Sequence, residues 1–215
     1  MTAARIAAAA IAASLSLAPL AGAQVVQPPF DSVYTLVDLG TPAGVPTSFG
    51  GVTLKNDDPN TLLLGGAANQ ASAAVYAIPL TRTCGRVTGF AGPGVFFADA
   101  PNIDGGLAYG PGGVLFFTRY STHAVGQILP GETTMHRSDT LAVNGFNGSV
   151  GAMQFVPAAF QSTGGAMAFA SYNSGRWARA GLSPAGDGSF DLVNITPSVT
   201  IFGGPEGIIY VPAGS

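Results

Sequence analysis

The two histidines are the side chains of this chain best suited to move protons at neutral pH. His136 stands directly before Arg137-Ser138-Asp139, and His123 lies in a separate polar stretch. A serine, a histidine and an aspartate that are close in sequence do not make a catalytic triad, because triads are assembled from residues that meet in space. No Gly-x-Ser-x-Gly turn, His-Glu-x-x-His motif or cysteine pair supports a nucleophile or a zinc site. We therefore predict no catalytic residue from these motifs.

Oxygen-bearing side chains are concentrated at Asn56, Asp57, Asp58 and Asn60. Calcium prefers about six to eight oxygen ligands, so such a cluster is chemically able to bind it. The spacing is not that of an EF-hand, however, and Asp, Asn and Pro are the residues that tight turns favour. We interpret this segment as a hairpin turn between two strands.

The elements that would position these side chains are short apolar runs between clusters of Gly, Pro, Asn and Asp, which is typical of strands joined by turns. A phrase of small, apolar and aromatic residues recurs among them. Phe155-Val156-Pro157-Ala158 returns as Tyr210-Val211-Pro212-Ala213, and Tyr109-Gly110-Pro111 holds the same place one repeat earlier. With Gly50-Gly51-Val52, these matches place the starts of four repeats near residues 50, 105, 151 and 206.

Each repeat divides into short strand candidates. We expect them at Val52–Leu54, Thr61–Leu64 and Ala73–Ile78, with a fourth undefined; at Leu107–Tyr109, Val114–Thr118, Ala124–Ile128 and Thr133–Arg137; and at Met153–Val156, Ala166–Tyr172, Arg176–Leu182 and Phe190–Ile195. Four antiparallel strands in about 40–50 residues are typical of a β-propeller blade. A sandwich would not repeat one phrase four times, and a β-solenoid usually has a shorter period. We therefore predict an all-β, propeller-like domain over residues 41–215.

The fourth repeat stops just after its first strand, so the sequence contains about three full blades and a partial one. Two interpretations remain open. Val33–Leu39, within the N-terminal segment 24–40, is a strand candidate that would pair with the last blade and close the ring. Otherwise the chain is a fragment of a longer propeller. An unclosed ring would leave an exposed blade edge, which favours self-association.

Residues 1–23 have the pattern of a cleavable signal peptide. Arg5 supplies a positive charge, Ile6–Leu20 is apolar, and Ala21-Gly22-Ala23 is a small-x-small cleavage site. The apolar run is shorter than the roughly 20 residues that span a bilayer. We predict a bacterial protein that is cleaved after Ala23 and exported, either secreted or retained in the periplasm or at the cell surface. No membrane span is predicted after cleavage.

Charge and cysteine content narrow the classes of partner. Charged residues make up 9% of the chain, Lys55 is the only lysine, and the net charge is −3 at pH 7. Nucleic-acid binding needs a basic patch and docking on anionic membranes needs clustered Lys and Arg, so neither is predicted. The single cysteine, Cys84, cannot form an internal disulfide. We expect it to be buried and inert, with a free thiol or an intermolecular link as the alternatives.

Two phrases carry a family resemblance. Asp104–Phe117 (DGGLAYGPGGVLFF) and Gly203–Pro212 (GGPEGIIYVP) resemble exported bacterial β-propeller proteins of unknown function, some of which end in a PEP-CTERM-type sorting tail. This chain has no Pro-Glu-Pro motif, terminal apolar helix or basic end, so sorting by such a tail is not predicted. More loosely, the phrases are similar to the blade starts of NHL and gluconolactonase-like propellers. The resemblance covers about residues 50 to 215.

The gluconolactonase-like resemblance implies a candidate metal site. In that group a Glu-Gly pair near an inner strand places a carboxylate on a central metal, and Glu206-Gly207 resembles this pair. Asp104 would offer a second oxygen and Asn102 or Asn147 a third, which suits calcium. The family's glutamate lies in an early blade, whereas Glu206 lies in the last repeat, and the remaining ligands have no match. The alternative is that Glu206 is a solvated turn residue.

Two functions follow as hypotheses. The first is an exported propeller-type protein with a non-enzymatic binding or scaffold role, whose partner is an unknown protein or carbohydrate ligand and which needs no cofactor. The second is a metal-dependent, calcium-type, lactonase-like hydrolase with its site at the propeller axis. The second would fail if the carboxylates of Asp104 and Glu206 lay on separate exposed turns.

Overall fold

The computed structural model describes residues 25–141, 146–163 and 166–211. The chain divides into two compact units, residues 1–38 and 39–215. The predicted signal peptide, with its cleavage site after Ala23, lies outside the described residues. Within the described part of the first unit, the regular element is a short 3-10 helix, η1 (Phe30–Ser32). Residues 33–39, where a strand was expected, contain none.

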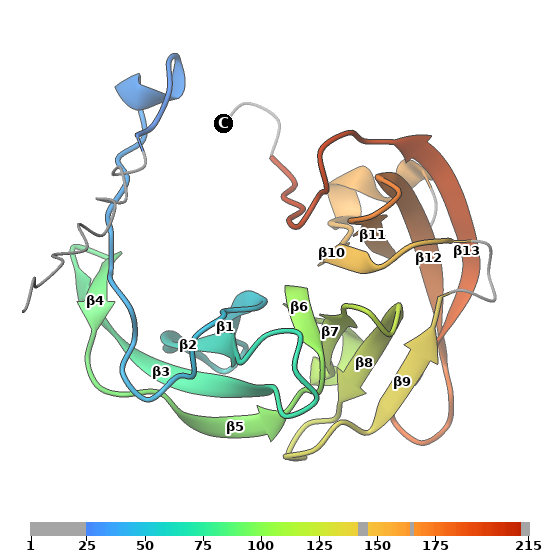
Figure 1. Cartoon of the computed structure of the whole chain (residues 1–215), viewed down its shortest axis with the longest axis horizontal. Coiled ribbons are helices and arrows are strands. Elements are labelled where there is room, and N and C mark those ends of the chain that lie inside the picture. The colour runs from blue at the N-terminus through green and yellow to red at the C-terminus, as the bar shows by residue number, and fades with distance from the viewer. Residues whose placement is uncertain (1–24, 142–145, 164–165, 212–215) are drawn as a thin grey trace, which may run out of the picture. The chain divides into compact units, whose positions relative to one another are not determined.

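Three antiparallel sheets build the second unit (Figure 1). The first sheet contains β1 (Val52–Lys55), β2 (Asp58–Gly66), β3 (Ala74–Thr83), β4 (Arg86–Phe90) and β5 (Val95–Asp99); the second contains β6 (Ile103–Tyr109), β7 (Leu115–Arg119), β8 (Ala124–Ile128) and β9 (Arg137–Thr140); the third contains β10 (Val150–Phe155), β11 (Met167–Ser171), β12 (Arg176–Pro184) and β13 (Phe190–Thr200). The 3-10 helices η2 (Pro111–Gly113) and η4 (Ala158–Thr163) join the first two strands of the later sheets. Strand order follows the chain in these two sheets, which confirms the predicted all-β, propeller-like blades. No described helix is long and apolar enough to cross a membrane.

The outer strands of the first two sheets differ from the prediction. In the second sheet the last strand is β9 at Arg137–Thr140, not Thr133–Arg137, and all four of its residues are polar. Hydrophobicity does not reveal it, because an edge strand that is only half-buried needs no apolar pattern. In the first sheet β3 pairs with β5 at one end and with β4 at the other, so two short strands occupy the undefined place.

The β3–β4 hairpin carries the cysteine away from the core. Its turn residues, Cys84 and Gly85, have φ angles of 50° and 77°, and Cys84 is exposed. The expectation of a buried cysteine is wrong, because the turn lies beyond the part of β3 that pairs with β2 and β5.

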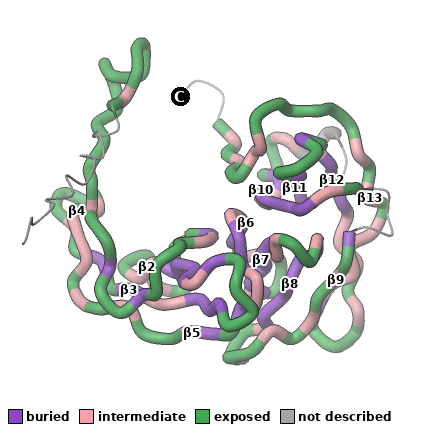
Figure 2. The backbone as a smooth tube through the Cα atoms, in the orientation of Figure 1, coloured by how far each residue is buried: buried purple, intermediate pink, exposed green. Residues whose placement is uncertain are grey.

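Alternating side chains on the middle strands form two interfaces between the sheets. Buried residues are concentrated on these strands (Figure 2). Phe117 of β7 is buried with Leu63 and Val75 of the first sheet, whereas the adjacent Phe116 is buried with Phe169 of the third sheet. Successive residues of a strand point to opposite faces of its sheet. The second sheet is therefore apolar on both faces, as propeller blades stacked face to face require.

Residues 201–211, which contain the phrase of the expected fourth repeat, form no strand. Among the described residues, no backbone–backbone hydrogen bond involves the stretch 202–211. A strand is stabilised by the ladder it joins, so a strand phrase without a neighbouring ladder stays irregular.

Candidate functional site

The start of β6 buries one of the two predicted metal ligands. Asp104, the second residue of the strand, has only 9% of its surface exposed. Burial, and after it the negative charge of Glu206, raises the pKa of the Asp104 carboxyl to about 6. Glu206 itself is exposed, in the segment that follows β13. The two carboxylates are therefore close enough to repel each other, although only one of them is buried.

Glycines allow three chain segments to meet at this place. A Cβ atom on Gly105 would lie 2.5 Å from the carbonyl oxygens of both Glu206 and Gly151, and one on Gly151 would lie 2.9 Å from the carbonyl oxygen of Pro205. Any larger residue would clash with backbone atoms at either position. The starts of β6 and β10 and the segment after β13 therefore approach one another only because these residues lack side chains.

Asn69 contacts Asp104 and was not among the residues selected from the sequence. Its side-chain amide hydrogen-bonds the Asp104 carboxylate and opposes the rise in its pKa. Asn69 has a φ of 66° in the connection between β2 and β3, a left-handed conformation that asparagine tolerates better than most residues. An asparagine in a turn was the only signal of this contact, and turn preference alone explains such a residue.

Asn102 and Asn147 are the other predicted oxygen ligands. The hydrogen bonds described for both are made by their backbones: the N–H of Asn102 donates to the carbonyl oxygen of Gln70, and the carbonyl oxygen of Asn147 accepts from the Ser174 hydroxyl. Among the residues that the structure describes, no three His, Cys, Asp or Glu side chains are grouped to hold a metal ion. The site around Asp104 thus offers one buried carboxylate, a neighbouring exposed one, an amide and nearby carbonyl oxygens.

Both histidines join segments that are distant in sequence. His123, in the β7–β8 turn, contacts the carbonyl oxygen of Phe146 through Nε2, and its ring stacks on the Phe146 ring with centroids 5.5 Å apart. His136 precedes β9, with Nδ1 3.1 Å from Glu132 Oε1 and Nε2 3.3 Å from Asp187 Oδ2. These contacts give each ring a structural role.

A cavity of about 570 Å³ opens at one margin of the interface between the first and second sheets. Its wall includes three aromatic residues, Phe96 and Phe97 from β5 and Tyr109 from β6. The β6–β7 connection passes it as Gly112-Gly113, with φ angles of 65° and 76° that favour glycine. Because these two residues have no side chains, the cavity stays open on that side.

Polar groups complete the wall of this cavity. The Lys55 ammonium lies 2.7 Å from Asp57 Oδ1. The Tyr109 hydroxyl accepts a hydrogen bond from the backbone N–H of Asn56, while burial raises the pKa of this tyrosine. Glu132 lies on the wall contributed by the loop between β8 and β9. The predicted hairpin turn at Asn56 and Asp57 is confirmed, and it forms one lip of the cavity.

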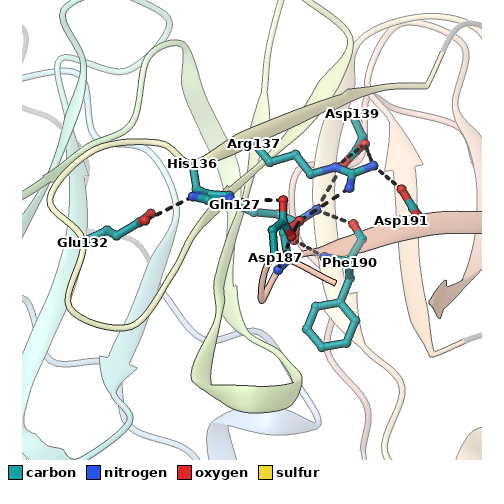
Figure 3. Close-up of polar contacts among 9 residues, drawn as sticks. Gln127, Glu132, His136, Arg137, Asp139, Asp187, Phe190 and Asp191 are labelled. Carbon is teal, nitrogen blue, oxygen red and sulfur yellow. Dashed lines mark hydrogen bonds and ion pairs between the residues drawn. The ribbon is translucent and has the colours of Figure 1, made fainter. Parts of the chain in front are cut away.

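A polar cluster occupies the corresponding margin between the second and third sheets (Figure 3). Gln127 of β8 is fully buried. Its Oε1 accepts from the backbone N–H of Phe190 at 2.9 Å, and its Nε2 donates to the Phe190 carbonyl oxygen at 2.6 Å. Arg137 pairs with Asp139 of its own strand and with Asp191 of β13. These contacts join β8 and β9 to the start of β13, so the cluster holds the second and third sheets together.

No protein-family model and no curated protein matches this chain. Among solved structures, the chain is similar to one described as "a putative 6-phosphogluconolactonase from Bacteroides uniformis ATCC 8492", with 13% sequence identity and a TM-score of 0.43. The match covers 72% of this chain and 45% of that protein, so the chain spans less than half of the other's length.

Proposed function

We propose that this protein is a propeller-type binding protein, which holds a ligand without changing it chemically in the cavity between its first two sheets. The observation that carries the proposal is the 570 Å³ cavity, whose wall combines three aromatic residues with charged and hydrogen-bonding residues. Sites for small ligands commonly measure about 300–1,000 Å³ and mix apolar surface with a few polar groups. A carbohydrate or a protruding side chain of a partner protein suits such a wall.

A pair of neighbouring threonines provides the test. Thr133 lines the cavity, whereas Thr134 is exposed and does not line it. Wild type, Thr133→Trp and Thr134→Trp would be screened by ligand-observed NMR against carbohydrates, peptides and small organic molecules. We expect ligands of the wild type to bind Thr134→Trp but not Thr133→Trp, and to be recovered unaltered after incubation. Equal binding to both variants would place the site elsewhere, and conversion of a ligand would contradict a non-enzymatic role.

A metal-dependent hydrolase is the second candidate, favoured by one observation. The buried Asp104 carboxylate has a pKa raised to about 6 beside Glu206, and a bound cation would relieve the repulsion that contributes to this rise. A ligand of the native state stabilises it, so calcium should then raise the Tm of the wild type. The same addition should leave the Tm of Asp104→Asn unchanged, and a lactone substrate should be hydrolysed only by the wild type. A wild-type Tm that does not respond to calcium removes this candidate.

We further propose that the protein is exported and cleaved after Ala23. Support comes from the charged, apolar and small-residue order of residues 1–23, which is that of a signal peptide. Expression of the full-length chain in a bacterium, followed by fractionation and N-terminal sequencing, tests the proposal. We expect a periplasmic or secreted protein that begins at Gln24. A protein that retains Met1 in the cytoplasm would contradict export.

Self-association through an open sheet edge is proposed as a further property. β13 is the last strand of the third sheet, and its Val199 side chain is 59% exposed. Exposed strand edges template pairing with other chains, and lysine on such an edge prevents it. We expect sedimentation to reveal oligomers of the wild type at high concentration and only monomers of Val199→Lys. Identical sedimentation of the two proteins would contradict this edge.

A further inference from the structure

We propose that the ligand of the cavity between the first two sheets is an organic cation, with an ammonium or guanidinium group on an apolar or aromatic stem. This inference rests on the proposed binding function and adds the chemical class of the ligand. It follows from two features of the wall, its charge and its aromatic rings, which point to the same chemistry.

The charge of the wall is negative. Lys55, Asp57 and Glu132 are the charged residues that line the cavity. Lys55 lies 2.7 Å from Asp57 Oδ1, so its charge is already matched and Glu132 remains. His136 contacts Glu132, but it also contacts Asp187, so these three groups stay net negative even when the histidine is protonated. A phosphate or carboxylate ligand would meet repulsion here, whereas a cation would be attracted.

The Glu132 carboxylate also has unused acceptor capacity. Oε1 contacts His136 Nδ1 at 3.1 Å, but Oε2 is buried from solvent and accepts no hydrogen bond. A buried acceptor without a donor destabilises the protein, and a donor placed beside it removes that cost. A ligand N–H group that reached this oxygen from the cavity would supply the missing donor.

The aromatic rings supply the second feature. Phe96 is 53% exposed, an unusual position for a large apolar ring, and with Phe97 and Tyr109 it belongs to the same cavity wall. Aromatic faces attract cations through their quadrupole and also pack against an apolar stem. A neutral sugar would use the rings but not the charge, and an anion would be opposed by the charge. A cation with an apolar stem uses both.

Three probes of one shape separate these possibilities: 2-phenylethylammonium, the neutral 2-phenylethanol and the anionic 3-phenylpropionate. Dissociation constants would be measured by NMR titration of the folded chain, following the signals of Phe96, Phe97 and Tyr109. We expect the ammonium to bind at least about tenfold more tightly than the alcohol, and the carboxylate to bind more weakly than both.

The variant Glu132→Gln keeps the shape of the side chain and removes its charge. It should reduce the preference for the ammonium over the alcohol to less than about threefold, while the alcohol binds as before. Asp99→Asn is the matched control, because Asp99 is an exposed carboxylate of β5 that does not line the cavity. This control should keep the wild-type preference.

The outcomes test separately whether the ligand is a cation and whether the cavity is a binding site. If the alcohol or the carboxylate binds as tightly as the ammonium, the cation is the wrong class while the cavity remains a binding site. If Glu132→Gln and Asp99→Asn behave alike, the charge of Glu132 does not select the ligand and the inference is overturned. If none of the probes binds at millimolar concentration, the inference also fails. The proposed function is then judged separately, by the compound screen with Thr133→Trp and Thr134→Trp.

Discussion

The two interfaces of the second sheet are alike at their centres and differ at their margins. Phe117 packs towards the first sheet and Phe116 towards the third, and both are fully buried. At the margin, the first interface opens into the 570 Å³ cavity, whereas at the second Gln127 bonds both backbone groups of Phe190. Blade packing needs only the apolar centre. The margin of an interface can therefore hold either a binding cavity, as between the first and second sheets, or a polar cluster that joins the sheets, as between the second and third. Which of the two forms depends on whether long polar side chains find hydrogen-bond partners there.

The loop between β8 and β9 belongs to both margins. Glu132 in this loop lies on the cavity wall and contacts His136, which contacts Asp187 beyond β12 (Figure 3). The same loop thus contributes the negative charge of one margin and part of the polar cluster of the other. Changes at either margin can be compared directly, because both act on one set of strands.

The largest effects should come from the shared apolar centre. Phe117→Ala and Phe116→Ala each remove a fully buried ring, so each should lower the free energy of unfolding by about 3–5 kcal/mol. Urea denaturation followed by fluorescence measures both. Where an alanine variant does not fold, the leucine variant of the same position gives a smaller loss in the same direction. A loss below about 1 kcal/mol at only one position would mean that the two interfaces are not equivalent at their centres.

The next largest loss of stability should appear only at the polar cluster between the second and third sheets. Gln127→Leu replaces the amide with an apolar side chain, which leaves the N–H and C=O of Phe190 without the group that bonds them. We expect a loss of about 1–3 kcal/mol in urea denaturation. Gln70→Leu is the control, since this glutamine is exposed, and it should change stability by less than about 0.5 kcal/mol. Equal losses would show that Gln127 acts through bulk rather than through hydrogen bonds.

The His136 contacts should add a small, pH-dependent contribution to the stability of the protein at the same polar cluster. Asp187 and Glu132 raise the pKa of His136 above its ordinary 6.5, and Ser189, followed by His136, lowers the pKa of Asp187 below its ordinary 3.8. Stabilisation by the protonated histidine is complete below its unfolded pKa and is lost as the pH rises through the raised value. Stabilisation that needs ionised Asp187 is lost as the pH falls through the lowered value.

The Tm difference between wild type and His136→Gln should accordingly be largest between about pH 4 and pH 6 and smaller at about pH 8. Differential scanning calorimetry across this range measures it. A difference that does not change with pH would assign the role of His136 to packing rather than to its charge.

The smallest effect should come from outside both interfaces. Cys84 is exposed in the β3–β4 turn, so its thiol should react rapidly with a thiol reagent in the folded protein. Cys84→Ser should change the free energy of unfolding by less than about 0.5 kcal/mol. Slow labelling that requires denaturant would mean that the hairpin is covered, and a large loss of stability would mean that it belongs to the core.

How far the fold was predictable depended on where each strand lies. β8 begins and ends where its apolar residues predicted, at Ala124–Ile128, because a central strand is buried on both faces. β9 was misplaced, because Arg137–Thr140 has no apolar residue and is held by hydrogen bonds to β8. Residues 206–211 have the pattern of a strand but lack a neighbouring ladder, so local pattern alone did not suffice there.

The sequence by itself determined the repeated strand phrases and the face-to-face blades that follow from them. It also identified Asp104 and Glu206 as candidate metal ligands. Both results depend only on residue types that lie close together in the chain. Only the tertiary structure decided that Asp104 is buried with Asn69 as its partner. It alone also gathered Lys55, Phe96 and Glu132 around one cavity. These residues lie on different strands and loops. Whether the margin of an interface holds a polar cluster or a cavity depends on which side chains come together across that interface. These contacts depend on how whole blades pack against one another, so no local sequence pattern predicts them.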